Sequence, residues 1–247
     1  MINSYVCLDL ETTGLDPGVE KLIEIGAVKV EEGKVMERFS TLVNPHRPLS
    51  DFVQNLTGIT EEELQSAPEL ETVLPKFLEF AGDYILLGHS VLFDYSFVKK
   101  AAVEQGLQFE RMAVDTLKIA RKFLPELESR SLPSLCRYYH LDYTPHRALQ
   151  DAEATHRLYQ CLLKNFYGME EEKEKVFKPV PQIYKAKKKA PITKAQREQL
   201  EKLLEIYEKD KTKYPIQIAL RIKDIPFLTR SEASRFVNQL LQQKISH

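Results

Sequence analysis

Short apolar runs separated by polar turns fill the first 45 residues. Residues 4–10 form an apolar, β-prone run that ends in a polar turn. Two longer runs, 21–30 and 35–43, are joined by the polar segment 31–34, which contains a glycine. A short loop of this kind between two runs rich in branched residues is typical of a β-hairpin. The pattern therefore predicts three strands at the start of the chain.

From residue 60 to residue 166 most apolar positions recur with helical spacing. Thr60 and Glu63 fit a capping box, in which each side chain satisfies a backbone amide that the start of a helix leaves without a partner. One brief apolar strand is predicted at 84–87, ended by Gly88. Helices are predicted at 69–80, 93–105, 115–123, 131–139 and 148–166. Strands followed by alternating helices and strands indicate an α/β domain with a mixed sheet.

The pattern changes after residue 167. Residues 168–191 combine an acidic cluster, two prolines and a lysine run, which is the composition of a linker. In 192–247 two stretches carry apolar residues on one helix face, and Thr229 to Glu232 forms a second capping box. We therefore predict an α/β domain at 1–167, a linker at 168–191 and a small basic helical module at 192–247.

Composition restricts the class of protein. The three cysteines, Cys7, Cys136 and Cys161, are far apart, so neither a disulfide framework nor a zinc knuckle is indicated. No apolar run approaches the ~20 residues that a membrane-spanning helix needs, and the N-terminus lacks the pattern of a signal peptide. We expect a cytoplasmic protein with no membrane partner. The net charge of −1 is uneven, because the segment before Gly168 is acidic and the tail is basic.

Asp9 and Glu11 place two carboxylates on one face of the first predicted strand, because side chains two residues apart point the same way. Close like charges in a half-buried place repel each other and are costly to desolvate, and divalent cations between them would remove both costs. Carboxylate oxygens suit Mg²⁺ or Mn²⁺. Two solvated acids at a strand end are the alternative. The short polar residues that follow, ending in Gly14, favour a site where a substrate approaches the backbone.

Three further positions are candidates for the same chemistry. Asp94 follows the strand at 84–87, at the edge where open α/β sheets bind ligands, although an acid at a helix N-terminus is also stabilised without a ligand. His146 precedes a helix that carries Asp151 in its first turns. A metal ligand needs the rigid position on the helix, whereas a general base must reach a water molecule from the loop. Taken singly, His146 also fits an exposed loop histidine.

Together these residues carry a family resemblance. The stretches VCLDLETTGLD, GHSVLFDYSFV and HRALQDAEAT resemble, in order and spacing, the three exonuclease motifs of the DEDDh family. The resemblance covers residues 4–166, including LVNP and LTGIT between the first two motifs. It is closest to the proofreading exonucleases of bacterial DNA polymerase III, of the epsilon-like or PolC type.

The resemblance implies a ribonuclease-H-like fold, with a five-stranded mixed sheet flanked by helices. It implies that Asp9, Glu11, Asp94 and Asp151 hold two Mg²⁺ or Mn²⁺ ions and that His146 is the general base. It also implies contacts to the terminal nucleotide, with Ile59 beside the last base, from these residues: Thr12, Thr13, Thr57, Ile59 and His89. Thr57 stands where close relatives often have histidine, and Ser90 stands where asparagine is common.

Three functions are compatible with these observations. The first is a 3′→5′ exonuclease that releases nucleoside 5′-monophosphates from single-stranded or frayed 3′ ends of DNA, alone or beside a polymerase subunit. The second is an RNA-trimming exonuclease of the same family, since the sequence does not show how a 2′-hydroxyl would be treated. The third is a non-catalytic nucleic-acid-binding adaptor, which the complete set of acids disfavours. The lysine cluster at 185–189 and the basic tail are candidates for sequence-independent attraction to a strand, with a solvated linker as the favoured alternative.

Overall fold

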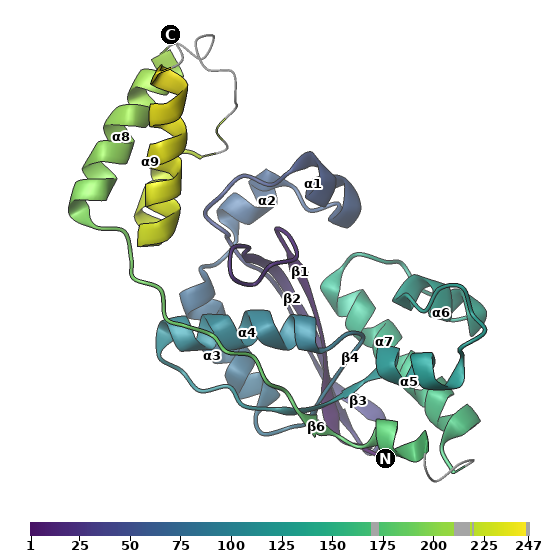
Figure 1. The fold of residues 1–247 in the computed structure, drawn as a ribbon. Coiled ribbons are helices and arrows are strands. Elements are labelled where there is room, and N and C mark those ends of the chain that lie inside the picture. The colour runs from purple at the N-terminus through teal and green to yellow at the C-terminus, as the bar shows by residue number, and fades with distance from the viewer. Residues whose placement is uncertain (169–172, 210–217, 219, 246–247) are drawn as a thin grey trace. The chain divides into compact units, whose positions relative to one another are not determined.

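A computed structural model describes residues 1–168, 173–209, 218 and 220–245 (Figure 1). The contacts divide the chain into two compact units. The first comprises Met1–Pro45 and Ser50–Lys187, and the second comprises His46–Leu49 and Lys188–His247. The division into a domain at 1–167, a linker at 168–191 and a module at 192–247 stays a prediction. No described helix has both the length and the apolar character needed to cross a membrane.

A mixed sheet forms the centre of the first unit. In the described part of the chain it has six strands in the order β3-β2-β1-β4-β5-β6. The strands are β1 (Tyr5–Thr12), β2 (Leu22–Glu31), β3 (Lys34–Leu42), β4 (Leu86–Gly88), β5 (Met112–Asp115) and β6 (Val180–Pro181). The neighbours β1, β4 and β5 run parallel, and the other neighbouring pairs are antiparallel. The expected mixed sheet and the opening hairpin are therefore confirmed.

The expected number of five strands is too low by one. The extra strand, β6, lies in the segment whose composition indicated a linker, and it pairs with β5 at the edge of the sheet. A two-residue strand that includes Pro181 has no alternating pattern to reveal it. Proline is tolerated there because an edge strand needs hydrogen-bond partners on one side only. Nearby, Phe177 is fully buried, so this segment packs into the core of the first unit.

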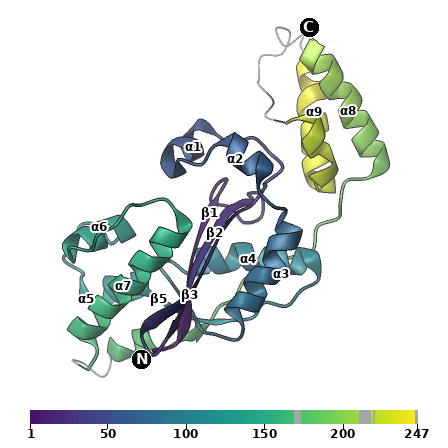
Figure 2. The same cartoon turned by 180° about the vertical axis from the view of Figure 1, so that it is seen from behind.

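Helices cover both faces of the sheet (Figures 1 and 2). Their bounds are α1 (Asp51–Thr57), α2 (Glu61–Ser66), α3 (Leu70–Ala81), α4 (Leu92–Gln105), α5 (Thr116–Phe123), α6 (Leu132–Tyr138), α7 (Ala148–Phe166) and the short 3₁₀ helix η1 (Lys173–Phe177). The capping box at Thr60 and Glu63 is present as predicted. Helices α3 and α4 lie on one face, and α5, α6 and α7 lie on the other.

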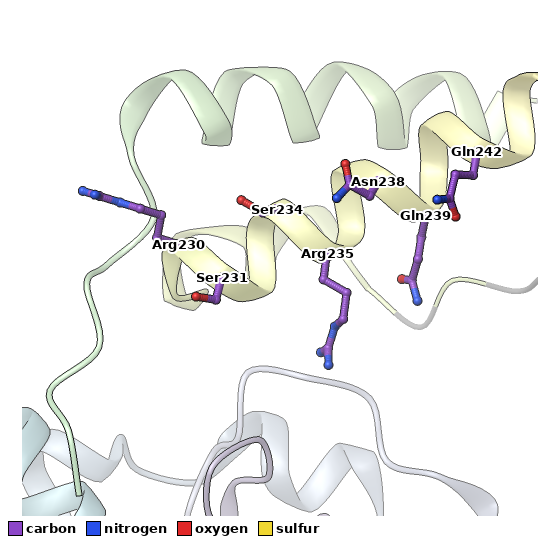
Figure 3. A pocket seen from close by; sticks show the side chains of 7 residues that line it. All are labelled: Arg230, Ser231, Ser234, Arg235, Asn238, Gln239 and Gln242. Carbon is purple, nitrogen blue, oxygen red and sulfur yellow. The ribbon is translucent and has the colours of Figure 1, made fainter.

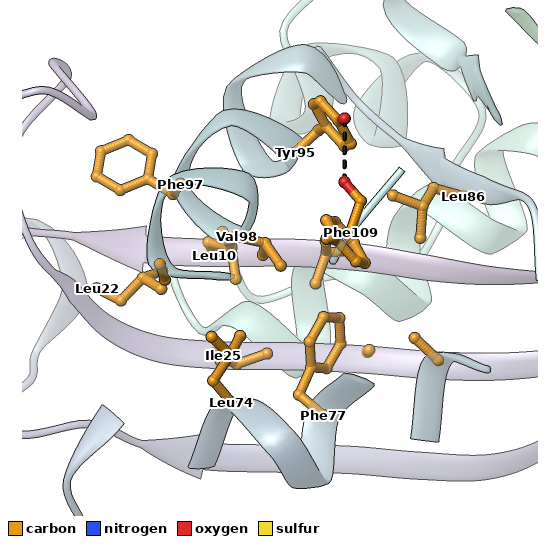
Figure 4. Packing of buried hydrophobic residues seen from close by; sticks show 14 of the residues in the cluster. Leu10, Leu22, Ile25, Leu74, Phe77, Leu86, Tyr95, Phe97, Val98 and Phe109 are labelled. Atoms are coloured by element: carbon orange, nitrogen blue, oxygen red, sulfur yellow. Dashed lines mark hydrogen bonds between the residues drawn. The ribbon is translucent and has the colours of Figure 1, made fainter. Parts of the chain in front are cut away.

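Each face of the sheet has its own apolar cluster. On the face of α3 and α4, Leu10 and Ile25 of the sheet pack against Phe77 and Tyr95 (Figure 4). The Tyr95 hydroxyl donates a hydrogen bond to the carbonyl of Phe109 at 3.2 Å, so this buried polar group is satisfied. The cluster under α7 includes the aromatic side chains of Tyr5 from β1 and Tyr159 from α7. Alternating side chains of β1 therefore anchor both layers, which holds the end of β1 rigidly.

Stability should depend on pH through His156, a buried histidine beside Tyr5 in the cluster under α7. The Nδ1 atom of His156 lies 2.8 Å from the Tyr5 hydroxyl, and burial lowers the pKa of His156. A lowered folded-state pKa means that the unfolded chain binds the proton more readily. Stability from this group is therefore lost as pH falls below the unfolded value of about 6.5, by at most about 1.4 kcal/mol per pH unit.

We expect His156→Gln, whose amide oxygen can still accept from Tyr5, to remove this part of the acid sensitivity. Urea unfolding of both proteins at pH 7.5 and pH 5.5, in chelator, measures it. The wild type should lose more unfolding free energy than the variant. Equal losses would show that His156 binds a proton equally well in the folded and the unfolded chain, so that its pKa is not lowered by folding.

The second unit contains a helical hairpin. It consists of α8 (Lys194–Lys209), a 3₁₀ helix η3 (Ile222–Phe227) and α9 (Arg230–Ile245). Leu200 and Leu204 of α8 pack against Val237 and Leu240 of α9. The predicted capping box is present, since Thr229 N–H donates to Glu232 at 2.8 Å and Glu232 N–H donates to the Thr229 hydroxyl at 3.3 Å. Each helix thus buries one apolar face against the other.

Candidate active site

Carboxylates from two elements converge at the end of β1. Asp9 and Glu11 lie on β1, and Asp151 lies in the first turn of α7. One ligand oxygen from each of the three lies within 4.8 Å of the others. Asp9 and Glu11 share a face as the strand pattern predicted, and α7 packs on β1 and β2, which brings Asp151 to them.

Asp94 supplies a fourth acid beside this group. It lies in the first turn of α4, directly after β4, and its side chain is buried. The parallel pairing of β1 with β4 brings the ends of both strands to one edge of the sheet, so α4 starts next to Asp9. After burial itself, the charge on Asp94 is the largest influence on the pKa of Asp9, and it raises that pKa. The structure therefore brings together all four acids that the motifs singled out.

Burial disfavours the charged form of every acid in this group, and repulsion by neighbouring acids adds to this effect for Asp9, Glu11 and Asp94. Burial, followed by the charges of Asp94, Asp151 and Glu11, raises the pKa of Asp9 well above its usual range. Burial and the charge of Asp151 raise the pKa of Glu11 to about 8. Oxygen donors this close, each costly to ionise alone, fit a divalent cation, because the cation's charge reverses both effects.

His146 lies at the entrance to α7 in a backbone conformation that is unusual for its type. Its φ is +70°, in the left-handed region that costs a non-glycine residue about 1 kcal/mol or more. Directly after it, the Arg147 N–H donates to the Asp151 carboxylate at 2.9 Å, and the Tyr143 hydroxyl also donates to that carboxylate. Asp151 thus ties down both sides of the loop that presents His146. The half-buried imidazole is close enough to lower the pKa of Asp151, against the larger effect of burial.

A buried glutamate on β2 holds the start of α7. Glu24 is 2% exposed, and its carboxylate accepts from Arg147 Nη2 at 2.9 Å and from the Ala148 N–H at 3.0 Å. The carboxylate therefore caps the helix from another element, where the helix dipole favours negative charge. Two residues along, a Cβ atom on Gly26 would lie 2.0 Å from the backbone of Ala148. Only glycine allows this approach, so Glu24 and Gly26 together set the position of α7.

We expect Glu24→Gln to lower kcat by about 10- to 100-fold, since groups that orient ligands typically contribute that much. Glutamine can still accept one hydrogen bond at Ala148 but loses the charge that faces Arg147. Steady-state kinetics should show a fall in kcat with little change in KM, while the melting temperature stays close to that of the wild type. Glu37→Gln is the matched control, because it removes an exposed carboxylate from β3. Equal kcat for both variants would contradict a positioning role for Glu24.

The five residues expected to contact the terminal nucleotide lie around the same end of the sheet or in α1 and the loop after it. Their hydroxyl and ring atoms are largely engaged inside the protein. Thr13 donates to Glu20 at 2.5 Å, and Thr57 donates to the Val53 carbonyl at 2.9 Å. Ile59 is 1% exposed.

The remaining two residues are engaged in the same way. The Thr12 hydroxyl donates to the Gly14 carbonyl at 2.7 Å. Each ring nitrogen of His89 lies 2.9 Å from a partner, one from the Thr116 hydroxyl and the other from the Arg130 carbonyl. Nucleotide contacts by these residues stay predictions.

Sequence reasoning missed Glu24, Gly26, Arg147 and Tyr143. A signal existed for the first two, because within residues 22–28 of β2 one glutamate and one glycine interrupt an otherwise apolar stretch. A charge in a buried strand implies a partner, and a glycine there implies a close backbone approach. For Tyr143 no pattern was available, since its role depends on the path of the loop before α7.

Comparison with known proteins identifies the family. Residues 6–159 match the Exonuclease family. The chain is 41% identical over 161 residues to a DNA polymerase III PolC-type of Caldanaerobacter subterraneus subsp. tengcongensis, and 40% identical over 166 residues to that of Bacillus subtilis. These matches cover 65% and 66% of this chain but 12% of each relative. The chain therefore spans about an eighth of the length of the curated relatives it matches.

Solved structures show the same fold. Exonuclease X in complex with 5′ overhanging duplex DNA matches with a TM-score of 0.55 at 26% identity, over 70% of this chain and 99% of that one. The nuclease domain of 3′hExo, a DEDDh family member bound to rAMP, matches with a TM-score of 0.57 at 23% identity, over 66% of this chain and 93% of that one. These matches confirm the expected family and fold. The chain thus belongs to the Exonuclease family, and its first unit carries the exonuclease domain of that family, with a cluster of acids whose oxygens are compatible with a divalent metal.

Proposed function

We propose that the chain removes nucleotides one at a time from single-stranded or frayed 3′ ends of DNA and releases nucleoside 5′-monophosphates. The observation that carries this proposal is the convergence of Asp9, Glu11 and Asp151, with oxygens within 4.8 Å, beside a buried Asp94. DNA is preferred over RNA because the relatives near 40% identity are DNA polymerases. A polymerase that supplies the 3′ end is the proposed partner.

In this proposal Asp9, Glu11, Asp94 and Asp151 hold two Mg²⁺ or Mn²⁺ ions. When bound, such ions lower the pKa of a water molecule and stabilise negative charge on the scissile phosphate and the leaving 3′ oxygen. His146 accepts the proton of the attacking water at an imidazole nitrogen and passes it to solvent. Glu24 and Arg147 fix the start of α7, so that Asp151 and His146 keep their relative positions.

Degradation of end-labelled strands tests this function. Single-stranded DNA and RNA of one sequence, labelled at the 3′ or the 5′ end, are incubated with Mg²⁺, with Mn²⁺ and with chelator, beside the Asp9→Ala variant. We expect mononucleotides from the 3′ end, with metal, from the wild type only, and faster release from DNA. Faster release from RNA would replace the DNA assignment with the RNA-trimming one. Retention of strands without cleavage under all conditions would favour a binding adaptor instead.

A further inference from the structure

Helix α9 of the second unit has an exposed polar face. An open groove of about 630 Å³ runs along this helix (Figure 3). Five exposed residues that line it, Arg230, Ser231, Arg235, Asn238 and Gln239, are called the α9 face here. Figure 3 shows Arg235 and Gln239 projecting from the same side of the helix. The face therefore offers guanidinium, hydroxyl and amide groups along one helix.

Exposed acidic groups are absent from this helix. The sequence of α9 contains one acid, Glu232, which is 6% exposed, caps the helix together with Thr229 and pairs with Arg47 at 3.0 Å. Among the described residues, the hairpin's exposed acids lie on α8, where Glu198, for example, pairs with Lys194 at 3.9 Å. Among the residues that the structure describes, Arg230 and Arg235 form no ion pair. Their charges therefore act outward, without neutralisation by a neighbour.

The charge of residues 188–247 and the burial of their apolar side chains restrict which class of molecule can bind the α9 face. Residues 188–247 carry 13 Lys and Arg against seven Asp and Glu. The apolar side of α9, including Ala233, Val237 and Leu240, is buried against α8, so it is not available for insertion into a lipid surface. Apart from Leu241, the exposed residues of α9 that the structure describes are polar or positively charged and rich in hydrogen-bond donors. A polyanion with many acceptor oxygens is the complementary partner.

We propose that the α9 face binds the phosphodiester backbone of single-stranded nucleic acid, at a place separate from the catalytic acids. The single strand is chosen because an exonuclease leaves one running away from its site, so this choice of occupant rests on the proposed function. Arginine, serine, asparagine and glutamine side chains are common contacts to phosphate and sugar. No aromatic side chain lines the groove, so base stacking contributes little and binding is independent of sequence.

The length of the α9 face fits a few nucleotides. From Arg230 to Gln239 the helix rises about 14 Å, at about 1.5 Å per residue. A stacked strand advances about 3.4 Å per nucleotide, so the face spans about four nucleotides. Each phosphate contact on a single strand contributes about 0.7 to the slope of log affinity against log salt. At about 0.1 M salt, each contact therefore raises the affinity about fivefold relative to the affinity at about 1 M salt, where this electrostatic contribution vanishes.

Fluorescence anisotropy with a 5′-labelled single-stranded DNA tests the proposal. The full chain carries Asp9→Asn in every sample, which prevents degradation. Removing both charges with Arg230→Gln and Arg235→Gln should raise Kd by about 25-fold at about 0.1 M salt and reduce the salt slope by about 1.4. The matched control is Lys202→Gln with Lys209→Gln, which removes two exposed charges from α8 of the same hairpin. Circular dichroism verifies that both pairs of substitutions leave the helices intact.

The outcomes separate this surface from the catalytic site. A large rise in Kd for the α9 variant and a small one for the α8 control supports the α9 face. Equal effects of the two variants, or none, overturn it. The same arginine substitutions in the otherwise unchanged chain should leave hydrolysis of the nitrophenyl ester of thymidine 5′-monophosphate unaltered, since that substrate is too short to reach a second surface. If the wild type hydrolyses neither this ester nor DNA, the proposed function fails, while the anisotropy result still decides about the α9 face.

Discussion

Asp9→Ala will abolish metal-dependent release of mononucleotides and leave the fold intact. Burial, followed by the charges of Asp94, Asp151 and Glu11, raises the pKa of Asp9 well above its usual range. Removing this carboxyl deletes a central oxygen donor but relieves repulsion. In chelator we therefore expect the melting temperature of the variant to equal or exceed that of the wild type.

Addition of Mg²⁺ or Mn²⁺ should raise the melting temperature of the wild type, because a ligand that binds only the folded state stabilises it. The variant should show a much smaller rise. Asp83→Ala is the matched control, since Asp83 is an exposed acid that precedes β4. Full activity in Asp9→Ala, or an equal metal-dependent rise in both variants, would overturn the metal assignment.

His146→Ala will slow turnover by roughly 10²- to 10⁴-fold, the usual contribution of a general base. Strand binding should persist, because the four acids and the α9 face stay in place. Added imidazole should restore part of the lost rate in this variant, which a structural role of His146 would not explain. His140→Ala is the control, since His140 is exposed and also has a positive φ. Unchanged turnover in His146→Ala would show that another group accepts the proton.

The predictions for Asp9 and His146 both concern the end of the sheet where β1 stops. The first strand carries Asp9 and Glu11, while α4 and α7 each add one acid from their first turn. Side chains at helix starts are held by the dipole and by caps, so the acids are positioned before any metal arrives. Glu24 contributes to this arrangement without belonging to the acidic group itself, because its carboxylate is occupied by Arg147 and the Ala148 amide.

The sequence by itself determined most of the elements and the chemistry of the acids, although β5 and α1 were not among the predicted elements. The strand predicted from residue 4 placed Asp9 and Glu11 on one face, because side chains two residues apart along a strand point the same way. The opening hairpin and both capping boxes were also predictable, because each depends on a few neighbouring residues. Local geometry of this kind needs no knowledge of the rest of the chain.

The tertiary structure alone decided how distant residues meet. Strand β6 exists because β5 offers an open edge, which no local pattern in a proline-containing segment reveals. The approach of α7 to Gly26 and its capping by Glu24 join residues more than 120 positions apart. The sequence predicted an apolar face on α9, but only the structure showed that this face packs against α8. Hydrophobic burial is non-directional, so the sequence determines which side chains are buried, but packing determines which partners they meet.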